Sequence, residues 1–241
     1  MIAIIPARSG SKRIKNKNTR SLKGHPLLAY TIKACLLSKS ISRVIVSTDC
    51  LKIAKIARAY GAEVPFMRPA EYATDDASDL GFLFHFFKNI DANEVALMRP
   101  TSPLRDPEVV DSVIDLYELY KKSEKQFTGL RTATFSNHSP YKMYHMDEDK
   151  IFKGFFEDYN GIKDYTNLPG QTFPKTYVPN GYIDIVKRET VLKNSVFGDK
   201  ILGIETAQIT DIDIEDDFYL ASLQVGSKID KLNLNKGDKI G

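Results

Sequence analysis

Short apolar runs alternate with amphipathic stretches along the first half of the chain. Runs of β-branched and other apolar residues predict strands, and apolar residues that recur every three to four positions predict helices. Alternation of the two is typical of β-α units and predicts an α/β fold with a mostly parallel, doubly wound sheet. The expected strands are residues 1–7, 43–47, 63–67, 94–98, 130–135, 182–186 and 201–204, and the expected helices are 26–37, 51–60, 79–89, 107–121 and 216–223.

Two residues are predicted to mark the ends of the helix at 51–60. Asp49 precedes this helix, where an aspartate can accept a free backbone N–H. Gly61 follows it and suits the left-handed turn that often ends a helix.

The pattern changes from about residue 127. Segment 136–176 is polar, aromatic and irregular. One interpretation is a long loop that packs its own aromatic side chains. The other is an excursion whose exposed aromatic side chains pack on a second subunit, because such residues are enriched at interfaces. We favour the second and expect one α/β domain over 1–225, with a dimerisation excursion at 136–176 and a loosely ordered polar tail at 226–241.

Composition restricts the class of protein. A chain of 241 residues that is 42% hydrophobic can bury a full core. A net charge of +3, from 34 basic and 31 acidic residues, lacks the broad cationic excess of a nucleic-acid binder. Two cysteines do not indicate a disulfide framework, and neither a leader nor a long apolar run is apparent. We therefore expect a cytoplasmic protein that binds neither nucleic acid nor membrane.

Positive charge is concentrated in the loop after the first expected strand. This loop also contains Gly10, whose missing Cβ lets backbone N–H groups approach a ligand. Lysine-rich loops are commonly plain solvated surface, but open α/β sheets bind ligands at the carboxyl ends of their strands. The spacing matches neither the P-loop nor the dinucleotide fingerprint. Because fixed cations bind polyphosphates strongly, we expect a nucleoside triphosphate here. The cations are Arg8, Lys12, Arg13, Lys15 and Lys17.

The same loop resembles the amino-terminal signature of the sugar-acid cytidylyltransferases, through residues 4–12 and Lys17-Asn18. This resemblance covers about residues 2–225 and implies a Rossmann-like nucleotide-diphospho-sugar transferase fold. It further implies transfer of CMP from CTP to a nine-carbon, sialic-acid-like sugar acid. A homodimer is also implied, in which the excursion exchanges between protomers. Further matches follow in order at 46–49, 60–64, 68–71, 76–78, 99–105, 179–181 and 211–213.

The nucleotide-binding residues are expected near the start of the chain. Arg8 and Lys17 are the best candidates to hold and neutralise the triphosphate, by chemistry and by motif match. Gly10, Ser11 and Lys12 complete the predicted cradle, whereas Arg13 and Lys15 are expected to be solvated. Asn18 offers the donor and acceptor that reading a cytosine edge requires. The resemblance implies that Arg68 reads the base.

The segment before helix 79–89 has two interpretations. Its acidic residues, Asp75 to Asp79, could simply favour the positive end of the helix dipole. The resemblance instead implies that this helix start touches the nucleotide through Ser78. Asp79 departs from the small hydroxyl residue often found there in the family.

Asp211 and Asp213 are the predicted magnesium ligands. Alternate residues of an extended segment point the same way, so both carboxylates could meet one hard cation. Most Asp-x-Asp sequences are solvated turns, but the family match favours a metal. Magnesium could lower the pKa of the attacking hydroxyl. No histidine fits a motif for a general base, so Asp211 joins Arg8 and Lys17 as a predicted catalytic residue.

The sugar-binding residues are expected in two later segments. The resemblance implies Arg99, Thr101, Ser102 and Arg105 in the first, and Tyr177, Asn180 and Tyr182 in the second. Three positions depart from the sialic-acid enzymes: Arg99 replaces a glutamine, Gly170 an arginine and Asp184 a tyrosine. These departures indicate an acceptor such as a legionaminic, pseudaminic or amino-substituted ulosonic acid.

Two other functions remain open. The chain could be a transferase for another sugar, with the aspartate pair as a metal clamp. It could also be a non-catalytic regulator that binds CTP without releasing pyrophosphate. The presence of Arg8, Lys17, Asp211 and Asp213 favours the cytidylyltransferase.

Overall fold

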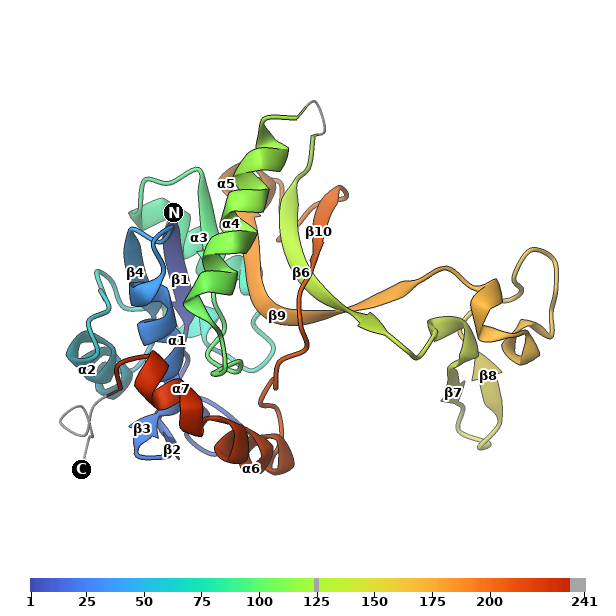
Figure 1. Cartoon of the computed structure of the whole chain (residues 1–241), viewed down its shortest axis with the longest axis horizontal. Helices are drawn as coiled ribbons and strands as arrows, with labels where there is room; N and C mark the ends of the chain where they lie inside the picture. The colour runs from blue at the N-terminus through green and yellow to red at the C-terminus, as the bar shows by residue number, and fades with distance from the viewer. Residues whose placement is uncertain (124–125, 235–241) are drawn as a thin grey trace.

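A six-stranded sheet forms the centre of the protein, in the order β10-β6-β9-β5-β1-β4 (Figure 1). The computed structural model describes residues 1–123 and 126–234. Strands β4, β1 and β5 are parallel, β10 is parallel to β6, and β9 runs antiparallel to both of its neighbours. The predicted mostly parallel α/β fold is therefore confirmed, with β9 reversed. The strands are β1 Ile2–Pro6, β4 Arg43–Ser47, β5 Glu94–Leu97, β6 Gly129–Ser136, β9 Thr176–Lys187 and β10 Ile201–Glu205.

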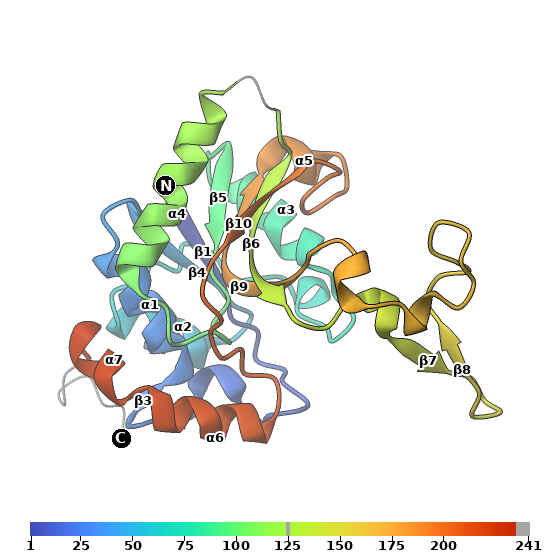
Figure 2. The same ribbon diagram turned by 45° about the vertical axis from the view of Figure 1, so that its right-hand side comes forward.

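Helices cover both faces of this sheet (Figures 1 and 2). Side chains alternate along β1, so Ala3 and Ile5 join one buried apolar cluster and Ile4 joins another. The first cluster includes side chains of α1, α2 and α4, and the second those of α3 and α5. The helices are α1 Leu27–Leu37, α2 Leu51–Ala59, α3 Asp79–Asn89, α4 Pro107–Lys121, α5 Arg188–Leu192, α6 Glu215–Gln224 and α7 Gly226–Lys231. None of these helices, in the part of the chain that the structure describes, is long and apolar enough to cross a membrane.

Short elements complete the chain. Strands β2 Ser21–Leu22 and β3 His25–Pro26 form a small antiparallel pair. The 3-10 turns are η1 Lys17–Thr19, η2 Ala70–Tyr72, η3 Pro140–Lys142, η4 Tyr165–Asn167 and η5 Gly170–Thr172.

The predicted strand at 63–67 is wrong. Glu63 makes an isolated parallel bridge with Ile45, and the segment then leaves the sheet. Pro65 has no N–H to donate, so it cannot continue a ladder of hydrogen bonds.

Of the two predicted ends of α2, the C-terminal one is confirmed and the N-terminal one is wrong. Gly61 follows the helix with a φ of 95°, as the left-handed turn requires. Asp49, however, does not cap the helix, because the residue at that position is Cys50. The Asp49 carboxylate instead accepts hydrogen bonds from the Ser9 backbone N–H at 2.8 Å and from its hydroxyl at 2.5 Å. Asp49 therefore holds the loop that follows β1.

A long arm leaves the body where β6 and β9 extend beyond the other strands (Figures 1 and 2). We define the arm as residues 133–179; its base is a two-stranded ribbon in which 133–136 pair with 176–179. Its tip carries a hairpin of β7 Tyr144–Met146 and β8 Phe152–Gly154. Aromatic rings pack there, with Tyr141 stacked on Phe173 at 5.0 Å between ring centroids.

The prediction of a loosely ordered tail is wrong for residues 226–234. Residues 226–231 form α7, and the following Leu232 and Leu234 are buried in the main apolar cluster. Lys231 also pairs with Asp106 at the start of α4, at 2.5 Å. Three apolar side chains, Val225, Ile229 and Leu232, recur at helical spacing, and they pack this short helix onto the body. Residues 235–241 lie outside the described part of the chain.

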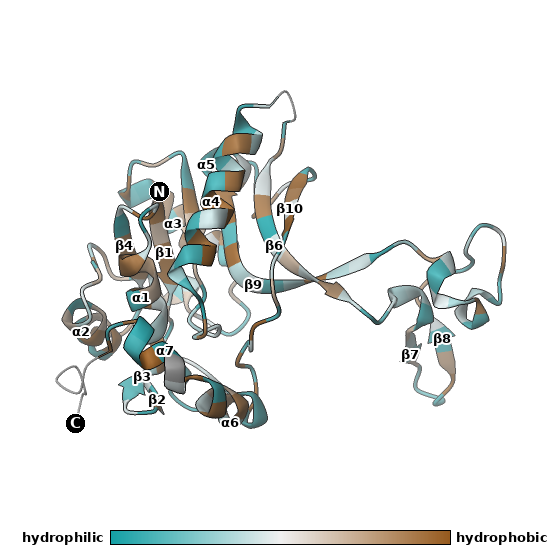
Figure 3. Ribbon diagram, viewed as in Figure 1, coloured by the Kyte–Doolittle hydropathy of each residue, from teal (hydrophilic) through white to brown (hydrophobic). Residues whose placement is uncertain are grey.

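The hydropathy of the chain follows the division into a body and an arm (Figure 3). Apolar positions concentrate in the strands of the body and on the inward sides of its helices. Large apolar side chains are also exposed on the arm, where Phe152 is 66% and Phe155 is 59% exposed. Some rings of segment 136–176 thus pack on one another, as the first interpretation expects, and others face solvent; their packing on a second subunit stays a prediction.

Candidate functional site

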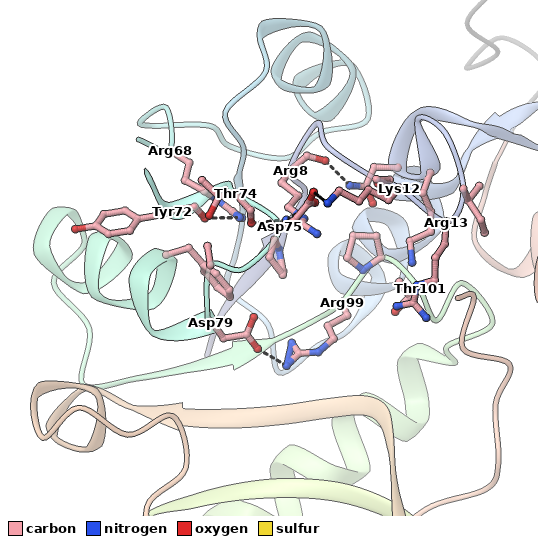
Figure 4. Close-up of a pocket in the computed structure, with 18 residues that line it drawn as sticks. Arg8, Lys12, Arg13, Arg68, Tyr72, Thr74, Asp75, Asp79, Arg99 and Thr101 are labelled. Atoms are coloured by element: carbon pink, nitrogen blue, oxygen red, sulfur yellow. Dashed lines mark hydrogen bonds and ion pairs between the residues drawn. The ribbon is translucent and has the colours of Figure 1, made fainter. Parts of the chain in front are cut away.

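A cavity of about 290 Å³ opens at the carboxyl ends of β1 and β5 (Figure 4). Its walls are the loop after β1, the turn after β5, and the segment from Arg68 to the start of α3. This is the edge at which open α/β sheets bind ligands. We call it the cationic cavity. The predicted site residues that line it are Arg8, Ser11, Lys12, Lys17, Asn18, Arg68, Arg99 and Thr101.

Buried side chains fix the shape of the loop after β1. Ile14 is buried in the main apolar cluster. The amide of Asn18, also buried, donates to the carbonyl of Arg8 at 2.9 Å. Asn18 thus stabilises the loop with one of the groups that was expected to read a base. Gly10 does not line the cavity, its backbone is outside the left-handed region, and an added Cβ would lie 4.0 Å from Asp75. The loop therefore does not require glycine there.

The two ends of the chain meet beside this cavity. The Lys17 ammonium donates to the carbonyl of Ile212 at 2.8 Å and lies 3.4 Å from the Asp213 carboxylate. Arg13 lies 3.3 Å from the same carboxylate. The backbone of Ile212 also donates to Thr101 at 2.7 Å, which ties this segment to the turn after β5. Arg13 lines the cavity with a side chain that is 66% exposed, so the expected contact with solvent is combined with an ion pair to Asp213.

A second carboxylate lies between Arg8 and Lys12, the other two cations of the loop that line the cavity. Asp75 is 3.2 Å from the Arg8 guanidinium and 2.7 Å from the Lys12 ammonium (Figure 4). Arg8 also donates to the carbonyl of Thr74. The hydrogen bond from Lys12 keeps the pKa of Asp75 below its usual value. Four cations of the loop are therefore paired with two carboxylates, and an excess of positive charge remains.

Asp211 and Asp213 have different partners. The Asp211 carboxylate accepts from the Ser102 hydroxyl at 3.3 Å and is exposed, whereas Asp213 faces Lys17 and Arg13. Among residues 1–123 and 126–234, no three His, Cys, Asp or Glu side chains gather as a metal cage. Magnesium retains several waters and is commonly held by one or two carboxylates together with substrate phosphates. Neither aspartate lines the cationic cavity itself, but Lys17 and Thr101 hold their segment beside it, so two partly exposed carboxylates there fit that mode of binding.

Arg68 lies deep in the wall of the cavity. Its guanidinium donates to the Ser47 carbonyl at 2.7 Å and hydroxyl at 3.0 Å, and it lies 4.7 Å from the ring centroid of Phe82. Burial lowers its pKa to about 10. Ser78 precedes α3 but does not line the cavity, although its neighbours Ala77 and Asp79 do.

Some of the predicted sugar-binding residues line the cationic cavity, and others do not. Arg99 and Thr101 line the cavity, and the Arg99 guanidinium pairs with Asp79 at 2.6 Å (Figure 4). Arg105 is fully buried and does not reach the cavity, so a contact between its side chain and a sugar is a wrong prediction. Its guanidinium donates to four backbone carbonyls, and burial lowers its pKa to about 10. The carbonyls and distances are Arg99 2.7 Å, Ser102 2.8 Å, Gly181 2.6 Å and Tyr182 2.5 Å.

The other predicted sugar residues also lie outside the cationic cavity. Ser102 and Asn180 are buried, and the Asn180 amide donates to the Thr206 hydroxyl at 2.7 Å. The Tyr182 hydroxyl accepts from the Asp106 backbone at 2.6 Å. Tyr182 and Asp211 border a second cavity, of about 910 Å³, between α4 and α6. Tyr177 is exposed at the base of the arm, where its ring packs against Phe135.

Comparison with known proteins identifies the family. Residues 2–152 match the family model described as cytidylyltransferase. The chain belongs to the cytidylyltransferase family. This membership confirms the resemblance that the ordered motifs indicated.

Two relatives and one solved structure are similar to this chain. It is 38% identical over 225 residues to the N-acylneuraminate cytidylyltransferase of Escherichia coli O18:K1:H7, covering 92% of this chain and 51% of the relative. It is 41% identical over 128 residues to the CMP-N,N'-diacetyllegionaminic acid synthase of Legionella pneumophila, covering 51% and 55%. The chain thus spans about half the length of these relatives. A CMP:2-keto-3-deoxy-manno-octonic acid synthetase solved with CTP aligns with a TM-score of 0.68, over 94% of this chain and 98% of that one. At 13% identity, this likeness shows the fold alone.

Sequence reasoning missed several residues of the cationic cavity. The sequence indicates Asp75 only as part of a helix start, and it gives no signal for Tyr72 or Thr74. No local signal identifies Asp75, since its partners Arg8 and Lys12 are more than sixty positions away in the sequence.

Proposed function

We propose that this protein transfers CMP from CTP to a sialic-acid-like sugar acid and releases pyrophosphate. The observation that carries this proposal is the convergence of Lys17 and Arg13 with the 211–213 segment at the cationic cavity. A hydroxyl oxygen of the sugar acid attacks the α-phosphorus of CTP. The bond from that phosphorus to the bridging oxygen of the β-phosphate breaks, pyrophosphate leaves with the electron pair, and the hydroxyl proton passes to solvent.

The side chains of the cavity supply positioning and charge for this reaction. Arg8, Lys12, Arg13 and Lys17 would hold the triphosphate and neutralise the charge that grows on the leaving pyrophosphate. Their positions are set by the buried Ile14 and by the hydrogen bond between Asn18 and Arg8. Arg68, buried beside Phe82, supports the wall on which the base would rest.

Magnesium is the cofactor that we propose for this site. Asp211 and Asp213 would hold it together with phosphate oxygens. When bound, it supplies Lewis-acid polarisation of the phosphate and lowers the pKa of the attacking hydroxyl. The role of Lys17 is separate, because its hydrogen bond to Ile212 keeps the acidic segment beside the loop.

For the acceptor, we propose a nine-carbon ulosonic acid. Relatives named for N-acylneuraminate and for N,N'-diacetyllegionaminic acid both support this class. Of the three departures from the sialic-acid pattern, Arg99 lines the cavity. Gly170 lies on the arm, and Asp184 is buried 3.4 Å from Arg131, where burial raises its pKa. Arg99 thus favours a modified acceptor such as a legionaminic, pseudaminic or amino-substituted acid.

Pyrophosphate release tests this function directly. The protein is incubated with each of the four common ribonucleoside triphosphates, a panel of ulosonic acids, and magnesium. We expect release with CTP and a sugar acid together, and none when either is omitted. A protein that binds CTP but releases no pyrophosphate with any sugar acid would be a regulator rather than an enzyme. N-acetylneuraminate as clearly the best acceptor would contradict a modified sugar.

Replacing Asp211 with asparagine tests the proposed metal ligand. We expect turnover to fall by about a hundredfold or more, because a neutral amide binds magnesium poorly while the backbone contacts of the segment remain. Asp216→Asn is the matched control, since Asp216 is exposed on α6 and borders neither of the two cavities. Magnesium titration of initial rates provides the readout, and near-normal turnover of Asp211→Asn would disprove the assignment.

We further propose that the arm mediates a homodimer. Its exposed Phe152 and Phe155 are apolar surface that a second subunit would cover. The double variant Phe152→Ser/Phe155→Ser should shift the protein from dimer to monomer in sedimentation velocity. Leu119→Ser/Leu223→Ser removes exposed apolar side chains from the body instead and should leave the dimer intact. Equal behaviour of the two double variants would contradict this role of the arm.

A further inference from the structure

Two cations that face the cationic cavity, Arg8 and Lys12, already have an anionic partner. Both oxygens of the Asp75 carboxylate are engaged, one 3.2 Å from Arg8 and the other 2.7 Å from Lys12. A phosphate group would bind these cations in the same way, through negative charge and hydrogen-bond acceptors. Asp75 therefore occupies the partners that a triphosphate needs.

The segment that carries Asp75 rests on the cavity through a small number of polar contacts. The carbonyl of Thr74 accepts from Arg8, and the carbonyl of Tyr72 lies 3.5 Å from the Arg68 guanidinium. The Tyr72 ring packs against α3 at Gly81, where an added Cβ would lie 2.5 Å from the ring. The segment is thus anchored beside Tyr72, and Asp75 lies beyond that anchor, next to Arg8 (Figure 4).

The two ion pairs are weak enough to be exchanged. The side chain of Asp75 is 31% exposed, that of Arg8 33% and that of Lys12 80%. Exposed pairs of this kind contribute little net stability, because water solvates both partners and salt screens them. A polyphosphate, with more charge and more acceptor oxygens than one carboxylate, can displace Asp75 from both cations.

We propose that Asp75 is an internal competitor for the phosphate groups, which weakens the binding of CTP and speeds the departure of pyrophosphate. This inference rests on the proposed function. Any ligand that needs Arg8 and Lys12 must first displace the carboxylate, so its apparent affinity falls by the fraction of molecules in which the cations are available. After transfer, the return of Asp75 to Arg8 and Lys12 favours the release of pyrophosphate.

Asp75→Asn tests the competitor because it keeps the size of the side chain and removes its charge. We expect the affinities for CTP and for pyrophosphate, measured by titration calorimetry at fixed magnesium, to rise about three- to tenfold. Inhibition of turnover by pyrophosphate should strengthen by a similar factor. Asp75→Glu retains the charge and should stay near wild-type affinity.

Asp76→Asn is the matched control. Asp76 is the next residue, is exposed, and makes no ion pair with the described residues, so its loss should change neither affinity. If Asp75 only orders the loop, Asp75→Asn would bind CTP more weakly, and this result or an unchanged affinity would overturn the proposal. If the wild-type protein binds neither CTP nor pyrophosphate, the proposed function fails and the competitor role fails with it. Binding by the wild type without tightening in Asp75→Asn rejects the competitor alone.

Discussion

Replacing Lys17 with methionine is expected to reduce kcat/KM for CTP by about 10²- to 10³-fold. The side chain is mostly buried and lines the cavity, and its ammonium contacts the carbonyl of Ile212 and the carboxylate of Asp213 beside it. In the proposed reaction it also faces the triphosphate. A positioned donor that stabilises charge growing in the transition state commonly contributes an effect of this size. Methionine retains the length of the aliphatic chain and removes only the charged group.

Lys15→Met is the matched control for this change. Lys15 belongs to the same loop but is exposed and does not line the cavity. Its replacement should alter kcat/KM by less than about twofold, since surface changes away from a site have small effects. Steady-state pyrophosphate release, with circular dichroism to verify the fold, provides the measurement. Similar losses in the two variants would mean that the loop acts only through its total charge.

Replacing Arg105 with methionine is expected to lower the free energy of unfolding by at least about 4 kcal/mol. The guanidinium is fully buried and donates to four carbonyls, two in the turn after β5 and two in β9. Each buried acceptor left without a donor costs about 1–3 kcal/mol. The variant should also misplace Arg99 and Thr101, because this residue holds their turn against β9. Folding and site geometry therefore depend on the same side chain.

Arg43→Met is the control for the loss of a buried arginine. Arg43 forms an exposed ion pair with Glu63 at 2.7 Å, and such pairs contribute up to about 1 kcal/mol. Urea unfolding followed by circular dichroism suits both variants, because the chain contains no tryptophan. Comparable destabilisation by the two replacements would contradict the structural role given to Arg105.

Motif matching found the cationic cavity but could not assign every residue of it. The loop residues Arg8, Ser11, Lys12 and Lys17 were identified because they are adjacent in sequence and follow a strand whose end is predictable. Arg105 was placed on the sugar because it belongs to a matching motif. Its burial depends on β9, a strand that arrives some seventy-five positions later and runs in the reverse direction. A motif shows which residue types occur together in the sequences of a family. The burial of each residue depends instead on the elements that pack against it.

The sequence by itself determined the layers of the fold. Apolar periodicity placed α3 and α4 at their observed bounds, since a helix must bury one stripe of side chains and a strand one or both faces. The same local rules located the cationic loop at the end of β1. They failed at 63–67, where Pro65 stops the ladder, and at 226–234, where a short helix is stabilised by the core it covers.

Only the tertiary structure decided which charges face one another. The pairs between Asp75 and Arg8, and between Asp213 and Lys17, join segments separated by more than sixty and by nearly two hundred positions. No local propensity encodes such a pair, because it forms only after the sheet has brought the carboxyl ends of β1 and β5 together. The direction of β9 is also decided by the tertiary structure, because an apolar strand can pair with its neighbours in a parallel or an antiparallel direction. The candidate functional residues could thus be predicted from the sequence, whereas the residues that they contact are determined by tertiary packing.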